Sequence, residues 1–344
     1  MKGCVTPPVP LSMKEPRKLS VLLLLIILTA SVQGQDYTYS QFYANPIYLN
    51  PALAGSDYCP RITLNYRNQW PQLPAAFVSS SASYDQYVDF ISGGVGVQFQ
   101  YDKSGEAAIR QFRLGGMYAY RLDIADRWQA SMALEAAFGQ RGVSWDDLIF
   151  ASRIDPASGN LLPAGSPPAN FRGNVNYVDF STGFVVGFDE KFFVGGAVHH
   201  LTTPDIGFIS ESENKLPMKI TIHAGANIES GGSRGYRSSQ SDFTISPNIL
   251  YQQQGDFRQL NVGTYFTLAP FVGGLWYRYA FENPDAVIVL LGLQYSNLKL
   301  GYSYDYTVSS LAIASGGAHE ISVGWLFDCN KKSKRSRAIK CPSF

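Results

Sequence analysis

Cysteine is the residue type in this chain whose chemistry is easiest to anticipate. Of the four cysteines, Cys4 belongs to a predicted secretion signal, which leaves Cys59, Cys329 and Cys341. Three thiols in an oxidising compartment can form one disulfide and leave one cysteine over. A Cys329–Cys341 bridge would close a small loop, whereas a Cys59–Cys329 bridge would join the two ends of the folded region. The sequence slightly favours the first pairing, and the geometry of the fold must decide.

A basic cluster close to the end of the chain is the second chemical feature. Its six residues are Lys331, Lys332, Lys334, Arg335, Arg337 and Lys340. Such a cluster can dock on an acidic protein surface by charge complementarity. It can equally be a solvated chain end without a partner. Both interpretations stay open.

Metal and catalytic chemistry find little support in the sequence. His199 and His200 are adjacent, so they should point to opposite faces of one strand and cannot readily share a metal. No Cys–His spacing typical of a zinc site is present. Serines are abundant, but none is predicted to occupy the strained strand-to-helix turn of serine hydrolases. We therefore expect no enzyme activity, no cofactor and no metal.

Alternating apolar and polar residues predict the elements that must position these groups. Between 270 and 281, one face carries Leu275 and Tyr277, and the other carries Trp276 and Arg278. A period of two is typical of β-strands. Strands of about ten residues with one apolar, aromatic-tipped face are typical of membrane-spanning strands. The fold class expected is therefore an all-β, antiparallel, outer-membrane type transmembrane β-barrel, because open sheet edges cannot be left in lipid.

About fourteen strands are predicted. They span 61–68, 76–84, 93–102, 109–120, 127–140, 175–188, 191–202, 217–229, 242–252, 257–268, 270–281, 286–296, 297–306 and 318–327. The odd-numbered connections include the long segments 141–174, 203–216 and 307–317, whereas the even-numbered ones include very short turns. Short periplasmic turns and long external loops would place both chain ends in the periplasm. The last strand should pair with the first and close the barrel.

The chain divides into four predicted regions. Residues 1–34 resemble a secretion signal, with an apolar run over 21–28 and cleavage after Gly34. Residues 35–60 form a periplasmic lead-in, 61–327 the barrel, and 328–344 the basic periplasmic tail. The net charge of +1 gives no support for nucleic-acid binding.

Inside the barrel, a set of charged residues should face the lumen. They are Arg61, Arg67, Arg113, Glu135, Lys219, Lys299 and Asp305. In a channel these groups would tune ion passage, and in a sealed barrel they would form buried pairs. Glycine pairs such as Gly93-Gly94 would ease curvature or let a plug approach the wall closely.

Two Asn-Pro dipeptides stand in the lead-in, Asn45-Pro46 and Asn50-Pro51. Asparagine before proline is driven out of the helical region, and its amide can bond the nearby backbone. The lead-in is therefore either a segment that a partner recognises or a folded segment that plugs the base of the barrel.

Several motifs resemble a known family. They are Gln35-Asp36, Ser40-Gln41-Phe42, Asn50-Pro51-Ala52-Leu53-Ala54-Gly55, Tyr66-Arg67-Asn68-Gln69-Trp70, His319-Glu320-Ile321-Ser322 and the terminal Cys341-Pro342-Ser343-Phe344. In this order they resemble the PorP/SprF family of type IX secretion and gliding-motility membrane proteins, although Leu53 stands where the family usually has tyrosine.

The resemblance implies an outer-membrane barrel of the Bacteroidota that works with type IX secretion. Expected partners are outer-membrane lipids, periplasmic ring or lipoprotein subunits, and a large secreted surface adhesin. The residues that the motifs single out for partner contact are Asn45, Pro46, Asn50, Pro51, Gly55, Tyr66, Arg67, Gln69, Trp70, His319 and Glu320. The alternative is a porin-like channel or an uptake channel for hydrophobic solutes, which requires an open lumen.

The long connection 141–174 is expected to lie outside the cell. Its four prolines, Pro156, Pro163, Pro167 and Pro168, exclude a strand pair. We expect it to fold over the barrel mouth, with an apolar patch formed by Trp145, Leu148, Ile149 and Phe150.

Overall fold

A computed structural model describes residues 36–73, 76–105, 109–211, 213–230, 243–281, 283–308 and 316–329. The predicted signal 1–34 and the basic cluster 331–340 lie outside the described residues. The chain from Gln35 onward forms one compact unit. In the described part, no helix has the length and apolar character needed to cross a membrane.

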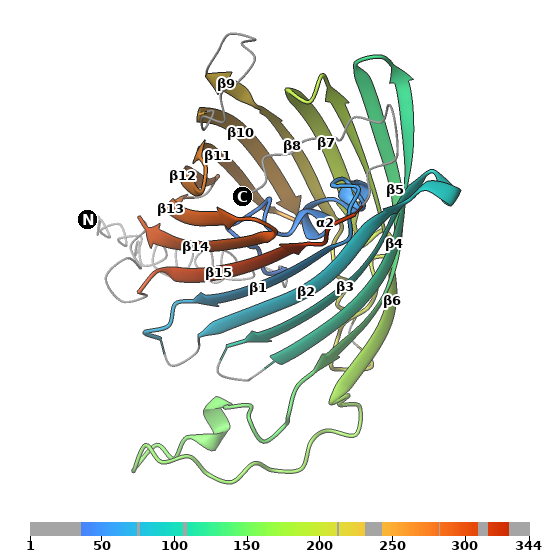
Figure 1. Ribbon diagram of the computed structural model, residues 1–344. Helices are drawn as coiled ribbons and strands as arrows, with labels where there is room; N and C mark the ends of the chain where they lie inside the picture. Colours follow the sequence, from blue (N-terminus) through green and yellow to red (C-terminus); the bar gives the residue numbers. More distant parts are fainter. Residues whose placement is uncertain are drawn as a thin grey trace, which may run out of the picture. The chain divides into compact units, whose positions relative to one another are not determined.

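The chain is built almost entirely of strands (Figure 1). They are β1 (Arg61–Gln69), β2 (Phe77–Val88), β3 (Gly93–Ser104), β4 (Ile109–Ala125), β5 (Trp128–Gly142), β6 (Asn174–Phe188), β7 (Phe192–His199), β8 (Lys219–Ala226), β9 (Ile228–Ser230), β10 (Phe243–Gln254), β11 (Phe257–Leu268), β12 (Phe271–Ala280), β13 (Asn283–Tyr295), β14 (Leu298–Thr307) and β15 (Ala318–Leu326). The short helices are α2 (Pro46–Leu49), η1 (Pro51–Leu53), η2 (Asp89–Ile91) and η3 (Ala151–Arg153).

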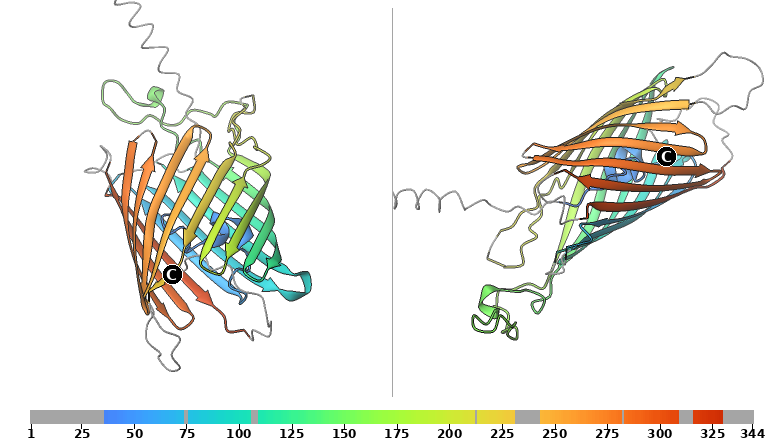
Figure 2. Two further views of the ribbon diagram at one scale, coloured as in Figure 1. Left: turned by 90° about the horizontal axis from the view of Figure 1, so that it is seen from above. Right: turned by 90° about the vertical axis from the view of Figure 1, so that its left-hand side faces the viewer.

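The strands close into one antiparallel barrel. Within the described ranges the sheet has 15 strands, and β8 and β9 both pair with β10, so they are two parts of one crossing. Fourteen crossings remain, as predicted. β1 pairs with β15, with Leu64 opposite Val323, and this pairing closes the barrel at the expected place. Figure 2 shows the slanted strands from two further directions.

The predicted facing of the side chains is confirmed on β12. The side chain of Leu275 is 52% exposed on the outer face, whereas its neighbour Trp276 is 1% exposed on the inner face. Arg278 is also buried inside. The outer surface is therefore apolar and suited to lipid, while polar and charged side chains turn inward.

The connection between β5 and β6 extends beyond the ends of these two strands (Figure 1). Trp145 holds it together locally, because its ring packs on Phe150 and Phe171 and its indole N–H donates to the carbonyl of Gly165 at 2.6 Å. Ile149 and Phe150 remain exposed. Near its end the segment also bonds the connection between β7 and β8, where the Arg172 backbone N–H donates to the carbonyl of Phe208 at 2.7 Å.

Candidate functional site: the plugged lumen

Residues 36–58, here called the plug, run through the inside of the barrel. Phe42, Ile47 and Leu53 of the plug are each at most 4% exposed. They share one hydrophobic cluster with inward side chains of the wall, including Trp276 and Leu250. The segment predicted as a periplasmic lead-in therefore lies within the barrel. Of its two interpretations, the one that agrees with the structure is the plug.

The Asn-Pro dipeptides shape the plug and fasten it to the wall. Pro46 and Pro51 begin α2 and η1, where a fixed φ suits the first helical turn. The Asn45 side-chain amide donates to Ser81 Oγ of β2 at 2.7 Å. The Asn50 amide donates to the carbonyl of Phe184 in β6 at 2.9 Å. These asparagines therefore contact the barrel wall.

Glycine allows the plug to lie directly against the wall. Gly55 has a φ of +67°, and its backbone N–H donates to Asp85 Oδ2 at 2.8 Å. A Cβ on Gly94 of β3 would lie 1.9 Å from the carbonyl oxygen of Ala54 in the plug. Any other residue at Gly94 would push the plug away, so this glycine serves the close approach that its sequence suggested.

A buried ionic cluster, here called the seam cluster, joins the plug to the first and last strands. Arg67 of β1 forms ion pairs with Asp305 of β14 at 2.9 Å and with Glu320 of β15 at 3.3 Å. Arg278 of β12 also pairs with Asp305, at 3.0 Å. The Ser40 hydroxyl donates to Asp305 Oδ2 at 2.5 Å, and its backbone N–H donates to Glu320 at 2.6 Å. Two cations thus balance two carboxylates around one plug residue.

Gln41 extends the seam cluster. Its side-chain amide donates to the carbonyl of Glu320 at 2.9 Å and to Ser303 Oγ at 3.2 Å. Its side-chain oxygen accepts from the Ser322 hydroxyl at 2.5 Å. The Ser40-Gln41 step of the family motif is therefore the part of the plug that β14 and β15 bind most fully.

A second buried cluster, here called the His200 cluster, holds the start of the plug. His200 bonds Asp36 Oδ2 at 2.6 Å through Nε2 and Asp179 Oδ2 at 2.7 Å through Nδ1. Burial lowers the pKa of His200, but the two carboxylates outweigh burial and raise it to about 9. Burial raises the pKa of Asp36, but charged His200 outweighs it, so the pKa lies well below its usual value. The pair is therefore ionic at neutral pH, with both His200 N–H groups donating.

The expectation that His199 and His200 face opposite sides is wrong. His200 follows the end of β7 and has a φ of +60°, so the chain turns there and both side chains are buried. His199 Nδ1 lies 4.0 Å from Glu135, which accepts a 2.7 Å hydrogen bond from Arg113. Among the described residues, no group of three or more His, Cys, Asp or Glu side chains is placed to hold a metal ion.

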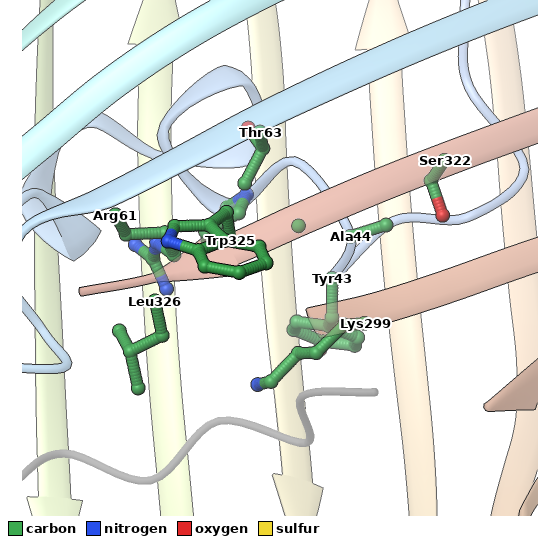
Figure 3. A pocket seen from close by; sticks show the side chains of 10 residues that line it. Tyr43, Ala44, Arg61, Thr63, Lys299, Ser322, Trp325 and Leu326 are labelled. Atoms are coloured by element: carbon green, nitrogen blue, oxygen red, sulfur yellow. The ribbon is translucent and has the colours of Figure 1, made fainter. Parts of the chain in front are cut away.

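Two small cavities lie between the plug and the wall. A cavity of about 20 Å³ lies between the His200 cluster, Tyr48 and Lys219, whose amine donates to the Tyr48 hydroxyl at 3.3 Å. Another of about 20 Å³ lies where Tyr43 and Ala44 of the plug face Lys299 and the β1–β15 wall (Figure 3). Each has room for about one water molecule. At the level of the plug, the lumen is filled by side chains and buried pairs.

The predicted lumen-facing charges take part in these clusters. Arg67, Arg113, Glu135, Lys219 and Asp305 are buried as described. Arg61 is also buried and pairs with Asp85 at 2.8 Å and with Asp57 at 2.6 Å. Arg61, Arg67, Arg113, Glu135 and Asp305 thus form the buried ion pairs expected of a sealed barrel, whereas Lys219 donates to a tyrosine hydroxyl and Lys299 is half-buried beside the cavity of Figure 3.

Other motif residues lie away from the plug. Tyr66 is 47% exposed on the outer face of β1. His319 accompanies it on the outer face of β15, with Nδ1 2.8 Å from the Tyr302 hydroxyl. Gln69 ends β1 at the rim, and Trp70 follows it. The backbone N–H of Trp70 donates to the Gly317 carbonyl at 2.8 Å, and the Trp70 ring packs on Phe77. The motif residues therefore do not form one surface.

The disulfide joins Cys59 to Cys329, with their Cα atoms 5.5 Å apart. The favoured Cys329–Cys341 pairing is wrong, because the closing pair β1–β15 brings the two ends of the barrel together. Beside it, the Phe327 N–H donates to the Pro60 carbonyl at 2.9 Å. The observed Cα distance lies within the usual range for disulfides. Cys341 lies outside the described residues.

Sequence reasoning missed four residues that hold the plug: Asp36, Ser40, Gln41 and Arg278. The alternation had placed Arg278 on the inner face, but gave no partner for it. Ser40 and Gln41 belonged to a family motif without an assigned role. The carboxylates that they bond, Asp305 and Glu320, lie more than two hundred residues further along the chain, and only barrel closure brings them near.

The fold and its filled interior define an outer-membrane-type β-barrel closed by its own N-terminal segment. Residues 31–325 match the family model described as type IX secretion system membrane protein PorP/SprF. The chain therefore belongs to this family, as its motifs suggested, and is a component of type IX secretion. The family and the fold are those of a membrane secretion component and not of enzymes.

Three solved structures resemble this chain at low identity, each with a TM-score below 0.5. The P. putida toluene transporter TodX is 9% identical, with a TM-score of 0.49 over 82% of this chain and 93% of that chain. A Pseudomonas aeruginosa FadL homologue is 11% identical, with a TM-score of 0.37 over 78% of this chain and 90% of that one. BamA from Haemophilus ducreyi lacking POTRA domains 1-3 is 8% identical, with a TM-score of 0.37 over 78% and 70%. Comparison with curated proteins gave no match.

Proposed function

We propose that this barrel is a non-enzymatic docking component of the type IX secretion and gliding machinery, which helps to secrete or anchor a large surface adhesin. The observation that carries the proposal is the plug. A protein whose lumen is filled by its own chain, held by buried ion pairs, is suited to present surfaces to partners. Both chain ends face the periplasm in this proposal, and the long connections face outward.

The runner-up is a channel for small or hydrophobic solutes. It requires a continuous path through the barrel, and the plug occupies that path. Breaking a buried ion pair costs about 3–5 kcal/mol, so displacing the plug would need a strong compensating interaction. The ion pair of Asp36 with His200 would have to break, and the seam cluster would lose its hydrogen bonds to Ser40 and Gln41.

The basic tail is the proposed contact with the periplasmic machinery. Its six basic residues, all within 331–340, fit an acidic surface on a ring subunit or lipoprotein. The tail leaves the barrel at Cys329, which is bonded to Cys59. The docking segment is thereby fixed to the base of the barrel.

The proposal is tested by two tail variants made in the full chain. One ends after Cys329, so the disulfide is kept, and the other replaces the six basic residues with glutamine. Both should fold, since β15 ends at Leu326. Detergent-solubilised outer membranes from each strain are used for pull-down and mass spectrometry.

Support for the proposal would be recovery of an adhesin and periplasmic subunits with the unaltered chain, and loss of the periplasmic subunits and of adhesin display in both variants. If the unaltered chain recovers neither class, or if display is unchanged in both variants while purified barrels conduct solutes, the channel is favoured.

A further inference from the structure

The outer faces of β3, β4, β5 and β6 form two adjoining depressions on the lipid side of the barrel. Strand register arranges the outward side chains in rows around the wall. The row nearest the end with long connections is Lys103, Arg110, Gly142 and Asn174. The next row is Tyr101, Phe112, Gln140 and Asn176. The third is Phe99, Leu114, Phe138 and Val178, and the fourth is Val97, Gly116, Ala136 and Phe180.

The depression farther from the long connections, here called the lower depression, is apolar. Gly116 and Ala136 face each other across β4 and β5, and a Cβ on Gly116 would meet nothing within 4 Å. Around these small residues stand the larger side chains of Val97, Leu114 and Phe138, each 45–51% exposed. The depression has a volume of about 420 Å³. Its shape and lining suit a hydrocarbon chain and offer nothing to a polar ligand.

The depression nearer the long connections, here called the upper depression, is polar and cationic. It has a volume of about 390 Å³ and is lined by residues that include Tyr101, Arg110, Gln140 and Asn174. Lys103 is directly opposite Arg110 across β3 and β4, and both are exposed. Like charges directly opposite each other destabilise a sheet. An anion between them would turn this repulsion into attraction.

The charges near this pair favour an anionic occupant. The four outward rows of β3–β6 contain two cations and no carboxylate. Asp102, next to Lys103 in the sequence, is buried on the inner face, where it accepts hydrogen bonds from Ser79 and Ser104. The outward rows of β3–β6 are therefore positively charged.

The two depressions are neighbours along β4, because Phe112 and Gln140 line one and the next outward pair, Leu114 and Phe138, lines the other. Gly116 and Arg110 are six residues apart, which is about 20 Å at roughly 3.4 Å per residue in a strand. This distance suits an acyl chain lying below a head group.

We propose that this groove binds an anionic phospholipid, with its phosphate between Lys103 and Arg110 and one acyl chain over Gly116 and Ala136. Free phosphate would leave the apolar part empty, and a zwitterionic lipid would not neutralise the cation pair. The site depends only on which way the strands face, so it does not rest on the role in secretion.

The test measures lipid retention by the full chain in nanodiscs, using native mass spectrometry with phosphatidylglycerol as the probe. One variant carries K103Q and R110Q together, and another carries G116L, which fills the apolar depression. R258Q is the matched charge control, because Arg258 is an exposed residue beside the turn at the same end of the barrel. G273L is the matched glycine control, because a Cβ there also meets nothing within 4 Å.

The double charge variant should lose about tenfold in phosphatidylglycerol affinity, in line with the loss of charged hydrogen bonds. G116L should also weaken retention, while both controls should match the parent protein. Phosphatidylcholine should bind more weakly than phosphatidylglycerol, and millimolar inorganic phosphate should not compete. Equal retention by all variants, loss in the charge variant only, or full competition by phosphate would each overturn the proposal. Heat-modifiable gel mobility confirms that every variant is folded.

Discussion

Ser40 and Glu320 are 280 residues apart in the sequence, yet the Ser40 backbone N–H donates a 2.6 Å hydrogen bond to the Glu320 carboxylate inside the barrel. Arg67 of the first strand contacts the same carboxylate at 3.3 Å. The residue that binds the plug therefore belongs to the strand that closes the barrel. Closure of the wall and seating of the plug depend on each other.

Replacing Glu320 with alanine should loosen the plug. Arg67 would lose a buried partner, and the Ser40 and Gln41 amides would lose their acceptor, which should destabilise the protein by about 3–5 kcal/mol. Planar-bilayer recordings should show higher ion conductance. His319→Ala is the matched control, because His319 lies on the outer face of the same strand. An E320A barrel that folds normally and conducts no more than H319A would contradict the role of this carboxylate.

The contacts of Asp36 should depend on pH in both directions. The pKa of His200 is raised to about 9, above the value of 6.5 expected in an unfolded chain, so its stabilisation is complete below pH 6.5 and is lost as pH rises through 9. The pKa of Asp36 is lowered, so its contribution is present above about pH 4 and is lost as pH falls. The hydrogen-exchange protection factors of residues 36–40, which correct for the intrinsic pH dependence of exchange, should be highest between these limits. In H200Q the alkaline loss should disappear, and an unchanged alkaline profile would argue against the pair.

Removing the disulfide should lower the free energy of unfolding by about 2–4 kcal/mol. The cleanest variant is Cys59→Ser with Cys329→Ser, since it leaves no thiol at the seam that could pair with Cys341. Urea titrations in lipid vesicles measure the loss, and reductant should bring the parent protein to the same midpoint. Cys341→Ser should change nothing, so altered non-reducing gel mobility in that variant would speak against the Cys59–Cys329 bridge.

Leu275→Arg should cost about 2–4 kcal/mol, because it places a charge in lipid near the middle of β12. Tyr279→Arg, on the same face but one residue from the end of the strand, should cost about 0–1 kcal/mol. Folding titrations into bilayers compare the two, and equal costs would mean that the facing or the depth is misassigned. Gly274, on the inner face of the same strand, is a poor control, because a Cβ there would lie 3.1 Å from both Leu290 and Tyr265.

A cysteine at Ser158 should react with a membrane-impermeant maleimide on whole cells. Ser158 is exposed in the long connection between β5 and β6, which the proposed topology places outside. Arg127→Cys, in the short turn between β4 and β5 at the opposite end, should react only after the outer membrane is permeabilised. The reverse pattern would invert the topology.

The wall of the barrel could be predicted from the sequence because the alternation that specifies each strand lies within that strand. Alternation on β12 assigns Leu275 to lipid and Trp276 to the interior, and both positions agree with the structure. Turn lengths give the number of crossings for the same reason. A strand with one face in lipid leaves little freedom in which residues point outward.

The interior could not be predicted in this way, because its contacts cross the whole sequence. Asn50 reaches β6, and Ser40 reaches β14 and β15, and neither distance is visible in a pattern of period two. The disulfide pairing could not be predicted for the same reason, because Cys59 meets Cys329 only after the barrel closes. His200 was misassigned because one residue with positive φ reverses the facing that alternation implies.

The bridge between Cys59 and Cys329 also gives the molecule a particular connectivity. Everything between these residues becomes a single covalent ring, from which the plug and the tail leave as two arms at the same node. A pull applied to the chain beyond Cys329 reaches Cys59 through one bond, without travelling around the strands or through the lipid. The first plug contacts it would meet are those of Tyr58 with Tyr87 and Arg121. Those of Asp57 with Arg61 and of Gly55 with Asp85 follow. The tail and the plug are therefore mechanically coupled at the base of the barrel, while the membrane-embedded wall stays in place.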